Sequence, residues 1–136
     1  MKKTEIIETT LVPEEARMGI LPKYLGVRHM MRGEALIFDW MKELCEEYSG
    51  GHWDMVEVSN GTFYMRQPKP AEVWLTGMNQ TTRRVSADAA GVIATLYALD
   101  SLAHQSGSPE IGALHQRLLA FVGRHAESAA IKALVD

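Results

Sequence analysis

The chain lacks most of the chemistry that identifies a small protein at first sight. Cys45 is the only cysteine among 136 residues, so an intramolecular disulfide and zinc sites built on several thiolates are excluded. No run of about 18 apolar residues occurs, which argues against a spanning helix. Glu5 and Glu8 interrupt the apolar residues that a secretory signal would need. We therefore expect a single domain over residues 1–136, in a reducing cytoplasm and without a membrane association.

A large excess of charge of either sign is also missing. The sequence has 14 Lys and Arg against 17 Asp and Glu, for a formal net charge of −3. A strongly basic nucleic-acid-binding protein would carry a large positive excess. A protein that imitates DNA would carry a large negative one, because duplex DNA has about one charge per 1.7 Å. The composition argues against both specialisations and leaves only local charged patches open.

Motifs with well-defined catalytic mechanisms are absent as well. The sequence contains no P-loop, dinucleotide-binding glycine pattern, Gly-x-Ser-x-Gly or His-Glu-x-x-His. Its five histidines include no pair at the i, i+4 spacing of a helical metal site. Cys45 is interpreted as a small hydrophobe, although a distant histidine could in principle make it a nucleophile. We expect no enzyme activity, no catalytic residues, no cofactor and no metal.

Strand and helix patterns follow one another in an order that predicts an α+β fold. Residues 5–12 predict an edge strand, and apolar residues at helical spacing predict an amphipathic helix over residues 29–48. Ser86, with Asp88 in the following turn, is a good N-cap for a central helix, and Ser108 begins another. We expect a small antiparallel sheet of three or four strands packed with four or five helices.

The dipeptide Asn60-Gly61 lies between two strand-like segments and is the strongest hairpin signal in the chain. A two-residue type I′ loop places Val58 opposite Phe63 and Glu57 opposite Tyr64. In that register one face of the hairpin is apolar. The other face mixes aromatic and charged side chains.

This mixed face, extended by a third strand over residues 71–76, is our candidate interaction surface. Residues 77–85 are expected to form a polar loop beyond it. If a helix covers the face it is core; if nothing covers it, its aromatic and arginine content is typical of a protein-interaction surface. The candidate residues are Trp53, Glu57, Tyr64, Arg66 and Trp74.

Charged side chains on the predicted helix over residues 29–48 and just before it are secondary candidates. They are Arg28, Arg32, Glu43, Glu46 and Glu47. Paired arginines are too few for strong phosphate binding, so nucleic-acid binding is expected to be weak and non-specific at most. The glutamates lie on or near the solvated face of that helix, and solvation is their simplest interpretation.

Methionine is frequent, with eight residues that include the pair Met30-Met31. Exposed methionines are typical of adaptable binding surfaces, because the side chain is flexible and polarizable. Buried ones fill irregular gaps in a core. We expect the second role for most of them.

Five groups of residues occur in the order known from the ArdB/KlcA antirestriction proteins of plasmids and mobile bacterial elements, which the chain resembles. They are Val12-Pro13 with Arg17-Met18 and Leu21-Pro22; His29 to Ala35; Tyr48-x-Gly50-Gly51-x-Trp53; Ser59-Asn60-Gly61 with Phe63-Tyr64-Met65; and Ser86 to Gly91. The similarity extends over about residues 10–100, and beyond them it consists mainly of helical character. It departs at Thr62, where many members of the family have a second glycine.

The resemblance implies a small α+β protein of the bacterial cytoplasm that protects incoming plasmid or phage DNA from type I restriction enzymes. Its implied partner is the type I restriction-modification system, directly or through a host factor. Together with the balanced charge, this favours protein contacts over extended DNA mimicry. The alternative is an accessory, non-specific nucleic-acid-binding protein of a mobile element, and a small hydrolase or transferase comes third. The oligomeric state stays open.

Overall fold

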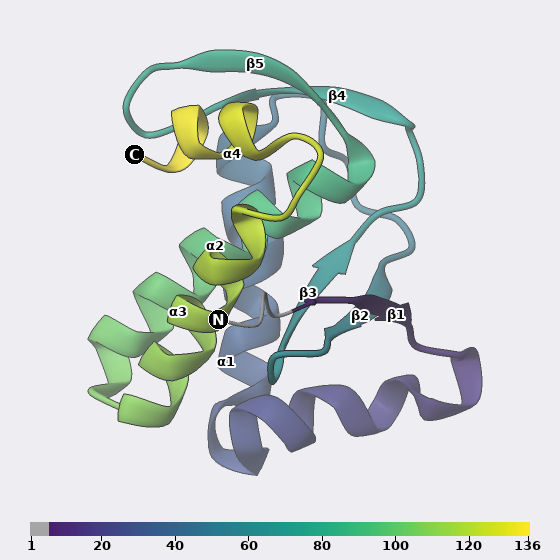
Figure 1. The fold of residues 1–136 in the computed structure, drawn as a ribbon, viewed down its shortest axis with the longest axis vertical. Helices are drawn as coiled ribbons and strands as arrows, with labels where there is room; N and C mark the ends of the chain where they lie inside the picture. Colours follow the sequence, from purple (N-terminus) through teal and green to yellow (C-terminus); the bar gives the residue numbers. More distant parts are fainter. Residues whose placement is uncertain (1–5) are drawn as a thin grey trace, which may run out of the picture.

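The computed structural model describes residues 6–136, whose helices and strands are arranged as an α+β fold (Figure 1). The predicted fold class is therefore confirmed. The elements in chain order are β1 (Thr9–Leu11), the 3-10 helix η1 (Glu14–Gly19), α1 (Ile20–Leu44), β2 (Asp54–Val58), β3 (Thr62–Arg66), β4 (Glu72–Thr76), β5 (Thr82–Ser86), α2 (Ala87–Ser106), α3 (Pro109–Val122) and α4 (Ser128–Val135). The predicted start of the first strand at Glu5 lies outside the described residues.

The strands form two antiparallel sheets, β1-β2-β3 and β4-β5, instead of the single sheet that we expected. Pro68 and Pro70 lie between β3 and β4, where two residues without a backbone N–H prevent a continuous ladder. The segment predicted as a polar loop over residues 77–85 also differs, because it contains most of β5. Thr76 pairs with Thr82 at the end of this second hairpin.

The first hairpin forms as predicted, but its register is shifted by one residue. Tyr64 lies opposite Val56, whereas the type I′ loop had placed it opposite Glu57. The loop has three residues instead of two: the N–H of Gly61 donates to the carbonyl of Val58 at 3.0 Å. Gly61 has a φ of +97°, the left-handed conformation that closes such loops. A shift of one residue moves side chains to the opposite face, so Tyr64 shares a face with Val56.

α1 begins at Ile20, well before the predicted start at His29, and ends at Leu44. Gly26 interrupts it with a φ of 75° and a ψ of 159°. These angles are open to glycine and break the helical hydrogen bonding. The turns before Gly26 therefore leave the axis of the main helix, and η1 continues them along one side of the molecule (Figure 1).

α2 lies at the centre of the core, as predicted for the helix that Ser86 caps, and its buried residues are mainly small and aliphatic. It packs against α1, α3 and α4 and against strands of both sheets. Gly91 makes the approach to β3 possible, because a Cβ there would lie 2.3 Å from the carbonyl oxygen of Met65. Thr95 also reaches β3, where its hydroxyl accepts a hydrogen bond from the N–H of Met65 at 3.2 Å. This helix joins the two sheets into one hydrophobic core.

Candidate functional site

Asp88, in the first turn of α2, is the centre of a polar network. One of its carboxylate oxygens accepts hydrogen bonds from the hydroxyl of Tyr64 at 2.7 Å and from Nη1 of Arg66 at 2.5 Å. The other accepts from Nε2 of His125 at 2.7 Å. The network thus connects β3, the start of α2 and the turn after α3. Sequence analysis had identified Asp88 only as a favourable charge at a helix N-terminus.

His125 is fixed by hydrogen bonds at both ring nitrogens. Its Nδ1 accepts from the N–H of Glu127 at 2.9 Å, so the proton that it donates to Asp88 is on Nε2. Glu127 in turn accepts from the N–H of Ser86 at 3.0 Å and from the Ser86 hydroxyl, which caps α2 by accepting from the N–H of Ala89. Each polar group has a partner within the protein, as expected of a structural network.

The pKa values in this network follow from burial and hydrogen bonding. Burial alone would raise the pKa of Asp88, but the hydrogen bonds from His125, Tyr64 and Arg66 outweigh it and lower the pKa to about 2. Burial raises the pKa of Tyr64, and the neighbouring carboxylate raises it further. At neutral pH the network therefore holds an ionised Asp88 beside a neutral Tyr64.

Glu57 belongs to a separate cluster on the other side of β2. Its carboxylate accepts hydrogen bonds from Nζ of Lys23 at 2.7 Å and from the hydroxyl of Tyr24 at 2.5 Å. The hydrogen bond from Lys23 is the main reason why the pKa of Glu57 is lowered. This cluster attaches the first turns of α1 to β2. Sequence reasoning missed it, because the contact joins residues far apart in the chain.

The structure does not bring the five predicted interaction residues together on one face. Trp53 and Tyr64 are only 4% and 1% exposed, and Tyr64 stacks on Phe121 of α3. Arg66 is half-buried in its ion pair with Asp88. The register shift and the helices that cover β3 account for the burial of Tyr64, whereas Trp53 packs against Phe38 of α1 and Tyr48. Trp74 alone is largely exposed, at 59%, and lies in the second sheet.

The secondary candidates are exposed but dispersed. Arg28 and Arg32 lie on α1, where Arg32 donates a hydrogen bond to Gln105 at the end of α2. Glu43 is in the last turn of α1, whereas Glu46 and Glu47 follow its end at Leu44. Because the helix ends early, these three glutamates do not form one helical face.

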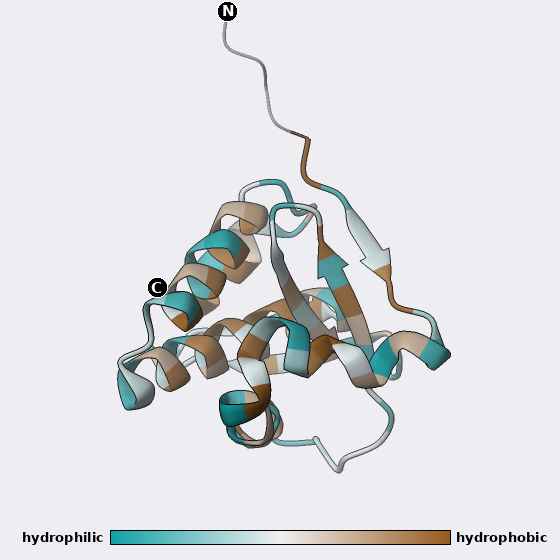
Figure 2. Ribbon diagram, turned by 90° about the horizontal axis from the view of Figure 1, so that it is seen from below, coloured by the Kyte–Doolittle hydropathy of each residue, from teal (hydrophilic) through white to brown (hydrophobic). Residues whose placement is uncertain are grey.

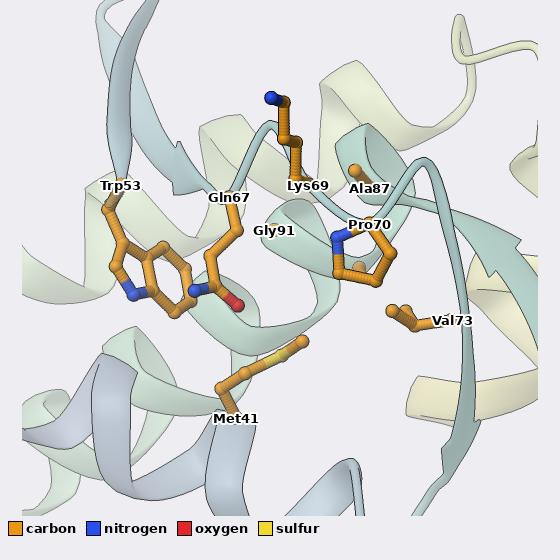
Figure 3. A pocket seen from close by; sticks show the side chains of 9 residues that line it. Met41, Trp53, Gln67, Lys69, Pro70, Val73, Ala87 and Gly91 are labelled. Atoms are coloured by element: carbon orange, nitrogen blue, oxygen red, sulfur yellow. The ribbon is translucent and has the colours of Figure 1, made fainter. Parts of the chain in front are cut away.

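A small cavity lies where the two sheets meet α1 and α2, and Figure 3 shows the side chains around it. Its volume of about 10 Å³ is enough for one water molecule at most. A neighbouring groove of about 310 Å³ includes Cys45 and Lys69 in its lining but no histidine. Cys45 is itself buried. This region therefore provides no pairing of a thiol with an imidazole base.

A second groove, of about 450 Å³, lies between η1 and α1. Four methionines line it, from η1, α1 and β2: Met18, Met30, Met31 and Met55. Met18 is 92% and Met31 78% exposed. Of the pair Met30-Met31, the exposed Met31 therefore belongs to the surface groove, while Met30 lines the groove and also packs against the core.

Within residues 6–136, no three His, Cys, Asp or Glu side chains are grouped so that they could hold a metal ion. None of the helices formed by those residues combines the length and the apolar character needed to cross a membrane.

Comparisons with known proteins give one consistent result. Residues 46–136 match the family model described as antirestriction protein. Two Escherichia coli proteins named antirestriction protein KlcA are 40% and 42% identical to the chain. Both alignments include 96% of this chain, and they include 95% of the first relative and 94% of the second. The putative antirestriction protein YubI of Escherichia coli strain K12 is 32% identical over 88% of the chain and 86% of its own length.

A solved structure agrees over the full length, with a TM-score of 0.88 and 38% identity, covering 100% of this chain and 99% of that one. It comes from work on KlcA and ArdB, which are described there as showing a novel fold and antirestriction activity against type I DNA restriction systems in vivo but not in vitro.

Proposed function

This chain belongs to the family of antirestriction proteins, and on that premise we propose that it relieves type I restriction of incoming plasmid or phage DNA in the bacterial cytoplasm. The observation that carries the proposal is the structural agreement, a TM-score of 0.88 at 38% identity over the whole chain. The protein of that structure is described as active against type I systems in vivo. Residues 1–136 would act as a single antirestriction domain.

The mechanism that we propose is protein contact, direct or through a host factor, without extended mimicry of DNA. A net charge of −3 supports this, because a surface that imitates the phosphates of a duplex needs a dense acidic array. Two acidic residues are also engaged internally: Asp88 with Arg66 and Glu57 with Lys23. The relatives' activity in vivo but not in vitro is what a route through an additional cellular component would produce.

We further propose that the protein acts without catalysis. Two groups that could serve acid–base or nucleophilic chemistry are already engaged or shielded. Both ring nitrogens of His125 are hydrogen-bonded within the protein, and Cys45 is only 3% exposed. A catalytic base needs a free nitrogen within reach of its substrate. Binding is therefore the activity that these residues support.

The second candidate function is accessory, non-specific nucleic-acid binding. It is favoured by the exposed Trp74, which lies opposite Arg84 in the second sheet and provides a surface for base stacking. It is opposed by Glu72, which pairs with Arg84 at 3.2 Å and neutralises the charge. Phosphate contacts weaken as salt rises, so a salt-dependent mobility shift would distinguish this function.

Phage plating tests the proposed function. Unmodified phage is plated on cells with an active type I system that express either the protein or an empty vector. We expect the protein to raise the plating efficiency at least about ten-fold. Cells without the type I genes, and phage already modified by the type I system, serve as controls. In both, the protein should leave the plating efficiency unchanged. Unchanged plating despite soluble expression would contradict the proposal for the system tested.

A further inference from the structure

The groove between η1 and α1 has the lining of a surface that binds an apolar partner. Four of the eight methionines line it: Met18 and Met31 are exposed, Met30 is partly buried and Met55 is buried. Met41 and Met65 are buried elsewhere in the core. Methionine side chains are unbranched and flexible, so they adapt to a bound apolar surface better than rigid aliphatic ones. Met18 is 92% exposed, so it does not fill a gap in the hydrophobic core.

The break at Gly26 creates the shape of this groove. It allows η1 and the first turns of α1 to run at an angle to the main helix (Figure 1), and the view from below shows hydrophobic and hydrophilic residues alternating along them (Figure 2). Beyond the break, Val27, Met31 and Glu34 follow one face of α1 at i, i+4 and i+7. Val27 is 77% exposed and extends the apolar strip past the groove.

The charges beside the groove are mainly negative. Glu14 and Glu34 line it, and the Glu14 side chain is 81% exposed. The single lining cation is Arg17, whose guanidinium already donates to the carbonyl of Trp53 and to Glu14. Arg28 is exposed on α1 and is not among the residues that line the groove. Glu14 and Glu34 thus place two carboxylates beside the apolar lining, of which Arg17 pairs with the first. Such a surface complements a ligand that is both apolar and cationic.

We propose that this groove is the docking site for a basic amphipathic helix of a partner protein. Such a helix would place its apolar side chains on the methionines and its Lys or Arg side chains beside Glu14 and Glu34. The inference rests on the proposed function, since it identifies the surface through which the protein reaches the restriction system or a host factor.

Methionine-methyl NMR tests where such a helix binds. The probe is a synthetic amphipathic peptide of Leu and Lys, added to protein with labelled methionine methyl groups. We expect the signals of the groove methionines to shift, while those of Met41, Met65 and the exposed Met78, in the turn between β4 and β5, stay in place. The same peptide with Glu in place of Lys should shift none of them. Shifts confined to Met78, or equal effects of both peptides, would overturn the proposal.

Paired variants test the chemistry by fluorescence anisotropy with the Lys peptide. We expect Met31→Glu and Glu34→Lys each to weaken binding about ten-fold or more, which corresponds to about 1.4 kcal/mol. The matched controls are Met78→Glu and Glu43→Lys, exposed residues away from the groove, and these should bind within about two-fold of the original protein. Thermal unfolding establishes that each variant folds. Equal affinity across all four variants would overturn the proposal.

Plating separates failure of this inference from failure of the proposed function. If the original protein gives no relief, the proposed function fails. If it gives relief and Met31→Glu gives the same relief as Met78→Glu, the groove inference fails alone. The other possible occupant of the groove is a second copy of the chain. Sedimentation of the free protein measures whether it dimerises, and NMR shows whether the dimer shifts the methyl signals of the groove. A concentration-dependent dimer that shifts these signals would assign the groove to a second copy and overturn the helix proposal.

Discussion

Replacing Asp88 by Asn removes the charge at the centre of the polar network while preserving its shape. The pKa of this carboxyl is lowered from 3.8 to about 2, because hydrogen bonds from His125, Tyr64 and Arg66 outweigh the effect of burial. A difference of nearly two pKa units corresponds to about 2 kcal/mol of stability at neutral pH. We therefore expect Asp88→Asn to lower the free energy of unfolding by about 2 kcal/mol at pH 7.

The effect of Asp88→Asn on stability depends on pH. A carboxyl whose pKa is lowered by folding stabilises the protein above its unfolded pKa, and that stabilisation is lost as pH falls toward the folded pKa. The difference between the original protein and Asp88→Asn should therefore shrink to roughly half at pH 3. Urea unfolding followed by circular dichroism measures it, with the exposed Asp39→Asn as control. A difference that is absent at pH 7, or the same at both pH values, would refute the reasoning.

Two further predictions concern packing. Gly91→Ala should lower the free energy of unfolding by about 1–3 kcal/mol, because its Cβ would collide with the carbonyl oxygen of Met65. Gly112→Ala is the control: nothing lies within 4 Å of the added Cβ, so it should be neutral or stabilising. Thermal unfolding of both variants measures the difference. Trp53→Ala should cost about 3–5 kcal/mol, since Trp53 is buried, whereas Trp74→Ala should change stability by less than about 0.5 kcal/mol. Urea unfolding measures both, and equal losses would contradict the assigned burial.

Local patterns predicted those elements whose signals are contained in short stretches of sequence. Ser86 and Ser108 each cap a helix through the side chain, accepting from the N–H of Ala89 and of Ile111 at 3.1 and 3.3 Å. Asn60-Gly61 likewise placed the first hairpin. The central position of α2 also followed from its own small and aliphatic residues.

Features that depend on tertiary contacts could not be predicted in this way. The hairpin register depends on whether the loop has two or three residues, and Asn60-Gly61 is compatible with both. β5 was missed because Arg83 and Arg84 look like loop residues, yet an exposed edge tolerates them. The partners of Asp88 come from three separate segments. The groove depends on the break at Gly26 inside α1.

The central claim, relief of restriction without DNA mimicry, is tested most directly by reversing the exposed acidic charges near the end of α1. In the triple variant Glu43→Lys, Glu46→Lys and Glu47→Lys, each reversal adds two positive charges, so the formal net charge moves from −3 to +3. The measurement is the plating efficiency of unmodified phage on cells with an active type I system. We predict the same relief as with the original protein. Loss of relief by a variant that is soluble and folded would contradict the claim.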